Sequence, residues 1–242
     1  MESTGASVEE LHPEADRILW DVMEEYVDEA EFAAESFEAA LDHPEYNLQE
    51  LADGPEEKLL ACVDGLVVGG PFVVDRLLAP AIDNAESEEP ARTTAVVLAL
   101  LASERRDLVV PYLRHPSDMV RTAAARACAL SVAPKVDPWL VDQLAAATTS
   151  AERATVLEVI AARGIALESL IESLNSTDDA ELAAAARAAK HADPRSHLGA
   201  VQWLVAQGEP TVRDAALITA LHYGSLECWN TCERLALDPA AP

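Results

Sequence analysis

Apolar residues in the last two thirds of the chain recur at helical spacing, in pairs of short runs separated by turns. The second run of each pair has a similar opening, as in "DMVRTAAARACAL" and "PTVRDAALITALH". Aligned at these openings, the runs have reference positions 29, 32, 29 and 31 residues apart: Arg92, Arg121, Arg153, Leu182 and Arg213. The last large apolar residues of the preceding runs keep a step of 30 or 31 residues: Ile82, Leu113, Leu144, Leu174, Leu204 and Leu235. The pattern therefore predicts a repeat of about 30 residues.

Each predicted repeat is a pair of helices too short to bury its apolar face alone, so neighbouring pairs must stack. We therefore expect an all-α fold, a right-handed α-solenoid of about five short helix pairs. Glycines and prolines such as Gly164 and Pro134 lie between the units, where helices stop and restart. The expected units are approximately 71–103, 104–134, 135–164, 165–193 and 194–224, with a half unit at 225–242.

The first seventy residues have a different pattern. Between Glu14 and Leu41 apolar residues recur every three or four positions, and most of the residues between them are acidic. This spacing predicts one long amphipathic helix with a strongly negative face. Asn47 is placed to cap a second helix. We expect residues 1–70 to form an acidic helical cap on the open end of the stack, continuous with it in one fold.

Charge adds a constraint on partners. The formal net charge is −26, and residues 1–60 hold 19 acidic residues against only Arg17 and Lys58. Such a surface repels a phosphate backbone, so we expect no direct nucleic-acid binding. One interpretation is that the acidic helix steers a basic protein partner, through Glu24, Asp28, Glu31 and Glu35. The other is that the acidity serves solubility or salt adaptation, and the scarcity of lysine, three against 14 arginines, agrees with it.

Motifs of catalysis are missing from the sequence. It has no Gly-rich phosphate loop, no G-x-S-x-G elbow and no H-E-x-x-H, so we expect no catalytic residues, no cofactor and no enzyme activity. Cys228, Cys232 and His222 could supply three ligands of a metal site, but buried core cysteines explain them more simply, and we expect no metal. No run reaches the ~18 uncharged apolar residues of a membrane helix. With no basic, apolar leader at its start, the chain is expected in the cytoplasm, away from membranes.

An acidic residue in the turn and an arginine opening the second helix resemble short HEAT repeats. Asp118 with Arg121 matches fully, whereas Glu89/Arg92 and Ser150/Arg153 match in part, Asp179 lacks the arginine and Arg213 lacks the aspartate. The resemblance implies that these side chains form a structural ladder between repeats, with no role in ligand binding. The members of that ladder would be Arg92, Asp118, Arg121, Arg153 and Arg213.

Three segments carry a narrower resemblance: "HPEADRILW", "HPEYNLQELADGPEEKLLACVDGLVVGG" and "ALHYGSLECWNTCERLA". They resemble an uncharacterised family of Gram-negative bacterial HEAT-like proteins, often encoded beside type VI secretion components. This resemblance implies an effector-linked role. The leading hypothesis is a non-catalytic protein-binding solenoid that inhibits a secreted effector, in the manner of an immunity protein. The alternatives are an adaptor that loads an effector onto the secretion apparatus, and a lyase-like enzyme that handles a cofactor or chromophore.

Overall fold

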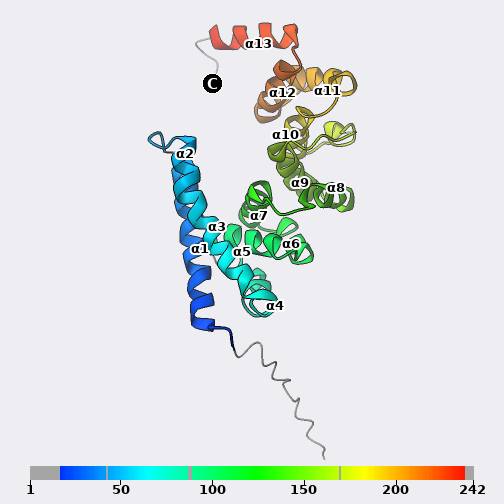
Figure 1. Cartoon of the computed structure of the whole chain (residues 1–242). Coiled ribbons are helices and arrows are strands. Elements are labelled where there is room, and N and C mark those ends of the chain that lie inside the picture. Colours follow the sequence, from blue (N-terminus) through cyan, green and yellow to red (C-terminus); the bar gives the residue numbers. More distant parts are fainter. Residues whose placement is uncertain (1–16, 42, 87–88, 169, 238–242) are drawn as a thin grey trace, which may run out of the picture. The chain divides into compact units, whose positions relative to one another are not determined.

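The computed structural model describes residues 17–41, 43–86, 89–168 and 170–237. All regular secondary structure in these ranges is helical, which confirms the predicted all-α class. The chain divides into two compact units, Met1–Ser103 and Glu104–Pro242 (Figure 1). The division falls between two expected repeats, whereas the expected cap boundary at residue 70 lies inside the first unit.

The first unit is built around one long helix, α1 (Trp20–Leu41), which packs against α3 (Glu57–Val68) and α5 (Pro90–Ala102). Shorter segments complete it: α2 (Leu48–Leu51) and η2 (Ala52–Glu56) lead into α3, and α4 (Gly70–Val73), η3 (Val74–Leu78) and η4 (Ala79–Asn84) follow it. The helix expected over the first half of repeat 71–103 thus changes pitch along its length. Pro80 lies at the start of η4, where its missing N–H and fixed φ favour a tightened turn over a continued α-helix.

The apolar stripe of α1 is buried as the sequence pattern predicted, at Val27, Ala30, Ala33, Ala34 and Phe37. Gly65 on α3 lets α1 approach closely, because a Cβ there would lie 3.0 Å from the Tyr26 ring. The buried stripe is shorter than expected at both ends, since Leu19 and Leu41 are exposed. The expected helical residues before Arg17 lie outside the described ranges.

Asn47 caps α2 as predicted. Its Oδ1 accepts hydrogen bonds from the backbone N–H groups of Gln49 and Glu50, at 2.9 and 3.0 Å. The Glu50 carboxylate accepts in return from the Asn47 N–H at 3.0 Å, which completes a capping box. Three N–H groups at the helix start, those of Asn47, Gln49 and Glu50, are thereby satisfied.

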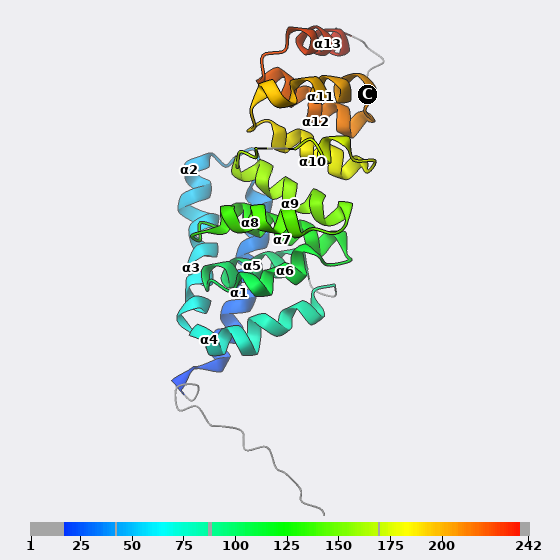
Figure 2. The ribbon, with the colours of Figure 1, turned by 90° about the vertical axis from the view of Figure 1, so that its right-hand side faces the viewer.

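The second unit consists of two rows of helices (Figures 1 and 2). The inner row is α7 (Asp118–Leu130), α9 (Ser150–Arg163), α10 (Asp179–Ala189) and α12 (Pro210–His222), and consecutive members contact one another. The outer row is α6 (Arg106–Leu113), α8 (Val136–Ala146) and α11 (Pro194–Gln207), each packed on the inner helix that follows it, and α13 (Leu226–Leu237) comes last. Together with α5, the inner row supplies all five predicted second helices.

Alanine permits this close packing. In α10 six alanines are buried, at 183–186, 188 and 189, and the helix lies between α9 and α12. Small side chains allow neighbouring helix axes to approach, and alanine has the highest helix propensity of any residue. Thr219 of α12 donates a hydrogen bond to the Ala186 carbonyl at 2.7 Å, which joins the two helices directly.

One predicted helix is absent. The sequence pattern predicts a helix over the first half of repeat 165–193, but the described residues between Gly164 and Asp178 are irregular apart from a single 3-10 turn at Ser173–Asn175. Gly164 ends α9 with a left-handed φ of 70°. The buried His197 ring then accepts the Leu170 N–H at 3.2 Å, in place of a helical carbonyl. Leu174, a reference position of the sequence pattern, is still buried, and so is Leu170. The pattern thus marked an apolar position of the core at Leu174 but not its conformation.

No single helix in the described ranges has both the length and the apolar character needed to cross a membrane. Leu48–Val68 and Gly70–Asn84 reach that composition only as a pair, with a bend of 105° between them.

Candidate protein-binding surfaces

The predicted acidic residues of α1 lie on one side of the helix. Glu24, Asp28, Glu31 and Glu35 are spaced by three or four residues, and we call them the acidic face. Glu24, Asp28 and Glu35 are exposed, whereas Glu31 is half-buried. The spacing places four carboxylates along three turns of helix, where their fields add.

Arg92 of α5 binds the middle of the acidic face. One guanidinium nitrogen lies 3.1 Å from Asp28 Oδ1 and 2.9 Å from Glu31 Oε2. Arg92, expected as a member of the repeat ladder, therefore ties α5 to α1. The side chains of Glu24 and Glu35 make no hydrogen bond or ion pair with any residue that the structure describes. Asp28 and Glu31 in the middle of the face therefore have a structural role, whereas the carboxylates at its two ends remain open to solvent.

Two other cations of the first unit are placed over aromatic rings. The Arg76 guanidinium lies 4.1 Å from the centre of the Trp20 ring, and the Lys58 ammonium lies 5.1 Å from that of Phe32. Such cation–π contacts stabilise by about 0.5–1 kcal/mol at exposed sites. Since neither of these contacts is with the acidic face, they leave its negative charge in place.

In the second unit a groove runs over the inner row of helices. It has a volume of about 370 Å³ and a floor of small side chains, and we call it the row groove; its lining includes Thr122, Ala125, Ala154, Thr155, Ala183 and Thr211. Glu158 and Arg187 separate it from a second hollow that extends to Ile218, an exposed isoleucine on α12. The Arg187 Nε lies 3.0 and 2.9 Å from the two Glu158 oxygens. The groove therefore combines apolar contact area with a fixed, half-exposed charge pair.

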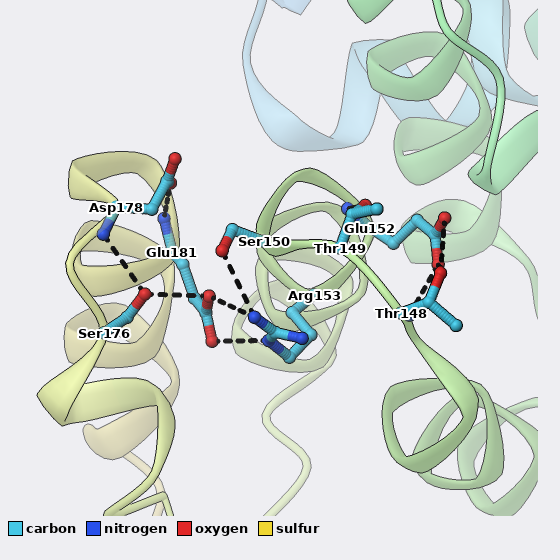
Figure 3. A network of polar contacts seen from close by, with 8 residues as sticks. All are labelled: Thr148, Thr149, Ser150, Glu152, Arg153, Ser176, Asp178 and Glu181. Carbon is cyan, nitrogen blue, oxygen red and sulfur yellow. Dashed lines mark hydrogen bonds and ion pairs between the residues drawn. The ribbon is translucent and has the colours of Figure 1, made fainter.

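Arg153 of α9 forms the most buried ionic contact that the structure describes (Figure 3). Its Nε lies 2.7 Å from Glu181 Oε1, and a second guanidinium nitrogen lies 3.1 Å from Oε2. The Glu181 side chain is only 1% exposed. Ser176 donates a further hydrogen bond to this carboxylate at 2.9 Å, and Ser150 accepts one from Arg153 at 3.2 Å. The network joins α9 to α10 across two expected repeats.

The pKa of Glu181 reflects this environment. Burial acts to raise it, but hydrogen bonds from Arg153, Ser176 and other serines outweigh burial and hold the pKa below its ordinary value of 4.5. The same contact raises the pKa of Arg153, chiefly through the hydrogen bond to Glu181. Both groups are therefore charged at neutral pH, and the pair is structural.

The remaining arginines of the expected ladder bind groups that are close to them in the sequence. Arg121 donates to the carbonyls of His115 and Pro116, at 2.7 and 2.8 Å, and pairs with Asp118 at 3.0 Å. Arg213 pairs with the adjacent Asp214 at 3.3 Å. Arg121 thus closes the turn before its helix, and among these arginines Arg153 is the one that reaches forward to the next expected repeat.

Other contacts between neighbouring helices could not be predicted from the sequence. Arg163, at the end of α9, donates to the carbonyls of Cys128 and Ser131 at 2.9 and 2.6 Å, and pairs with Asp137 at 2.6 Å. It therefore satisfies free carbonyls at the end of α7. Arginine is common in the last turn of a helix, and only the packing reveals that this one binds the end of the inner helix before it, α7.

The cysteines lie apart from these surfaces. Cys228 is buried on α13, Cys232 is half-buried one turn later, and burial raises the pKa of the Cys128 thiol to about 12. Within the described ranges, no group of three or more His, Cys, Asp or Glu side chains is arranged to hold a metal ion. The expectation that the protein binds no metal still rests on the sequence alone.

Comparison of the chain with protein-family models, with curated proteins and with solved structures finds no match. The surfaces themselves therefore carry the functional argument. They offer charge, shape and apolar contact, which are the elements of macromolecular recognition.

Proposed function

We propose that this protein is a non-catalytic, HEAT-like, right-handed α-solenoid that binds a basic protein and inhibits it. The observation that carries the proposal is the open pair Glu24 and Glu35 on the acidic face, which keeps its charge while Asp28 and Glu31 hold Arg92. A negative surface of this kind accelerates the approach of a positive partner. The row groove supplies contact area for the complex that forms.

The sequence resemblance suggests which partner to test, namely a secreted effector of a type VI system, met in the cytoplasm of the cell that makes both proteins. Inhibition needs no chemistry from the binding protein, only a complex that covers the effector's working surface. This agrees with a chain in which catalytic motifs are missing from the sequence.

The test begins with affinity capture of the chain from its own lysate at low and high salt, followed by identification of the bound protein. We expect one stoichiometric partner of high isoelectric point, whose activity falls as the complex forms. Because the attraction is electrostatic, capture should weaken as salt rises. Recovery of an active partner in a ternary complex with spike components would show an adaptor, and the inhibitor proposal would be wrong.

A matched pair of variants separates the acidic face from general acidity. Glu24→Gln with Glu35→Gln removes two charges from the face without touching the Arg92 contact. We expect about tenfold weaker binding of the captured partner at low salt, and a shallower salt dependence. Glu227→Gln with Glu233→Gln removes the same charge from exposed positions on α13 and should leave binding within about twofold. Equal effects of the two pairs would mean that the acidity serves solvation.

A further inference from the structure

The position of the missing helix leaves a groove beside α8. In the outer row, α8 would be followed by the first helix of repeat 165–193, but an irregular segment stands there instead. In Figure 1 this segment is the yellow-green loop between α8 and α11. A helix flank that lacks a helical neighbour keeps apolar side chains in contact with water, and Val141 on α8 is 38% exposed.

The groove has a volume of about 600 Å³, and we call it the side groove. Val141 and Leu144 of α8 line one wall, and Leu167 and Leu170 of the irregular segment line the other. Two exposed carboxylates, Glu168 and Glu172, also line the groove. The structure therefore combines apolar walls with a negative rim.

The one cation in this lining, Arg153, is already occupied by the buried Glu181. Glu168 and Glu172 make no side-chain hydrogen bond or ion pair with the described part of the chain. Glu172 interacts electrostatically with Arg153, but without direct contact, and both exposed carboxylates can still pair with a cation of a partner. Any occupant that places an anion at this rim would meet repulsion, whereas a lysine or arginine would be attracted.

We propose that the side groove binds an amphipathic helix of a partner protein, with its apolar side on Val141, Leu144 and Leu167 and its basic side toward Glu168 and Glu172. The occupant is a helix because the groove lies where the sequence of outer helices α6, α8 and α11 is interrupted. A helix presents apolar residues at three- and four-residue spacing on one side, which suits an apolar groove with a charged rim. This inference rests on the proposed protein-binding function and specifies the partner's surface.

The probe is a synthetic Leu–Lys amphipathic peptide of about 14 residues, roughly four turns of helix. Titrated calorimetrically into the full-length protein, it should bind and gain helicity by circular dichroism. A Leu–Glu peptide of the same pattern should bind at least about tenfold more weakly, because its carboxylates face Glu168 and Glu172. Equal binding of the two peptides would overturn the proposal.

Variants then locate the bound peptide. Glu168→Gln with Glu172→Gln should weaken it about five- to tenfold at low salt, and Val141→Asp, at an exposed position, should weaken it by a similar factor through the apolar wall. The control pair Glu227→Gln with Glu233→Gln should stay within about twofold. If the control pair weakens peptide binding as much as the pair at Glu168 and Glu172, the peptide is held by the overall negative charge and the proposal is overturned.

Two further outcomes separate this inference from its alternatives. A concentration-dependent dimer dispersed by Val141→Asp would make a second copy of the chain the occupant, against the proposal. If the natural partner is inhibited equally by wild type and Val141→Asp, the inhibitor function stands and the groove inference fails. If the Leu–Lys peptide binds in the groove but no natural partner is inhibited, the groove inference stands and the inhibitor function fails.

Discussion

At the scale of single residues, the Arg153–Glu181 contact shows how one charge pair joins two neighbouring helices, α9 and α10. Arg153 keeps 29% of its side chain exposed, whereas Glu181 keeps 1%. Removing the guanidinium would leave a carboxylate in the protein interior with only serine hydroxyls to stabilise it. Leaving one partner of a buried pair is much more costly than removing both.

We therefore expect Arg153→Met to lower the free energy of unfolding by about 2–3 kcal/mol, less than for a fully buried pair because the arginine is partly hydrated. Chemical denaturation followed by circular dichroism measures the change. Arg213→Met is the control, since its partner Asp214 is 65% exposed, and it should cost under about 1 kcal/mol. A double variant, Arg153→Met with Glu181→Met, should recover part of the loss, and no recovery would contradict the charge argument.

At the scale of elements, His197 determines the course of the irregular segment. Its Nδ1 lies 3.0 Å from the Asp193 carbonyl oxygen, and its Nε2 accepts the Leu170 N–H. Since an N–H can only donate, Nε2 carries no proton, and Nδ1–H donates to the carbonyl. One buried imidazole thereby connects the start of α11 to a segment 27 residues earlier in the chain.

His197→Leu keeps a side chain of similar size but leaves the Leu170 N–H buried without its acceptor. We expect a loss of about 1–3 kcal/mol in the free energy of unfolding, from the desolvated N–H. Hydrogen exchange should show faster exchange at the Leu170 amide, with little change in the α12 amides. His222→Leu, at an exposed position, serves as control, and an unchanged Leu170 amide would show that another group supplies the bond.

The same element marks the limit of what the sequence could predict. The inner helices were predictable because their alanine-rich runs have helical spacing and begin after turn residues. The apolar residues of segment 165–174 have helical spacing too, yet its described residues form no α-helix, and the Leu170 N–H is bound by the His197 imidazole in place of a backbone acceptor. Likewise, the acidic face was visible in the pattern of α1, but its division by Arg92 depends on contacts 61 and 64 residues distant. Long-range side-chain partners leave no trace in local periodicity.

At the scale of the whole molecule, lowered carboxylate pKa values predict how stability depends on pH. Burial opposes the lowered pKa of Glu181 but is outweighed by hydrogen bonds, and the backbone bond from Thr148 is the largest cause of the lowered pKa of Glu152. Groups whose pKa is lower in the folded state bind fewer protons there than in the unfolded state. Their contribution to stability is therefore full above the ordinary pKa of 4.5 and is lost as pH falls through the folded value.

Thermal unfolding measured across acid pH should show a melting temperature that is flat near neutrality and falls below about pH 4.5. Glu181→Gln should lower the melting temperature at neutral pH and make the acid fall shallower, because one of the titrating groups is gone. Glu227→Gln, on exposed α13, should leave both features unchanged. A Glu181→Gln curve parallel to wild type would show that this carboxylate does not contribute to the acid limb.

The order of the inner helices has a consequence for how quickly the second unit acquires its structure. α7, α9, α10 and α12 each contact the next member of the row, so the joining contacts close loops of about one repeat. Short loops are closed at low entropic cost, and topologies of this kind reach the native state quickly. Each helix pair can dock as soon as the following one leaves the ribosome, without waiting for the end of the chain. Synthesis and folding of the helices of the second unit can then proceed in the same direction, one helix after another.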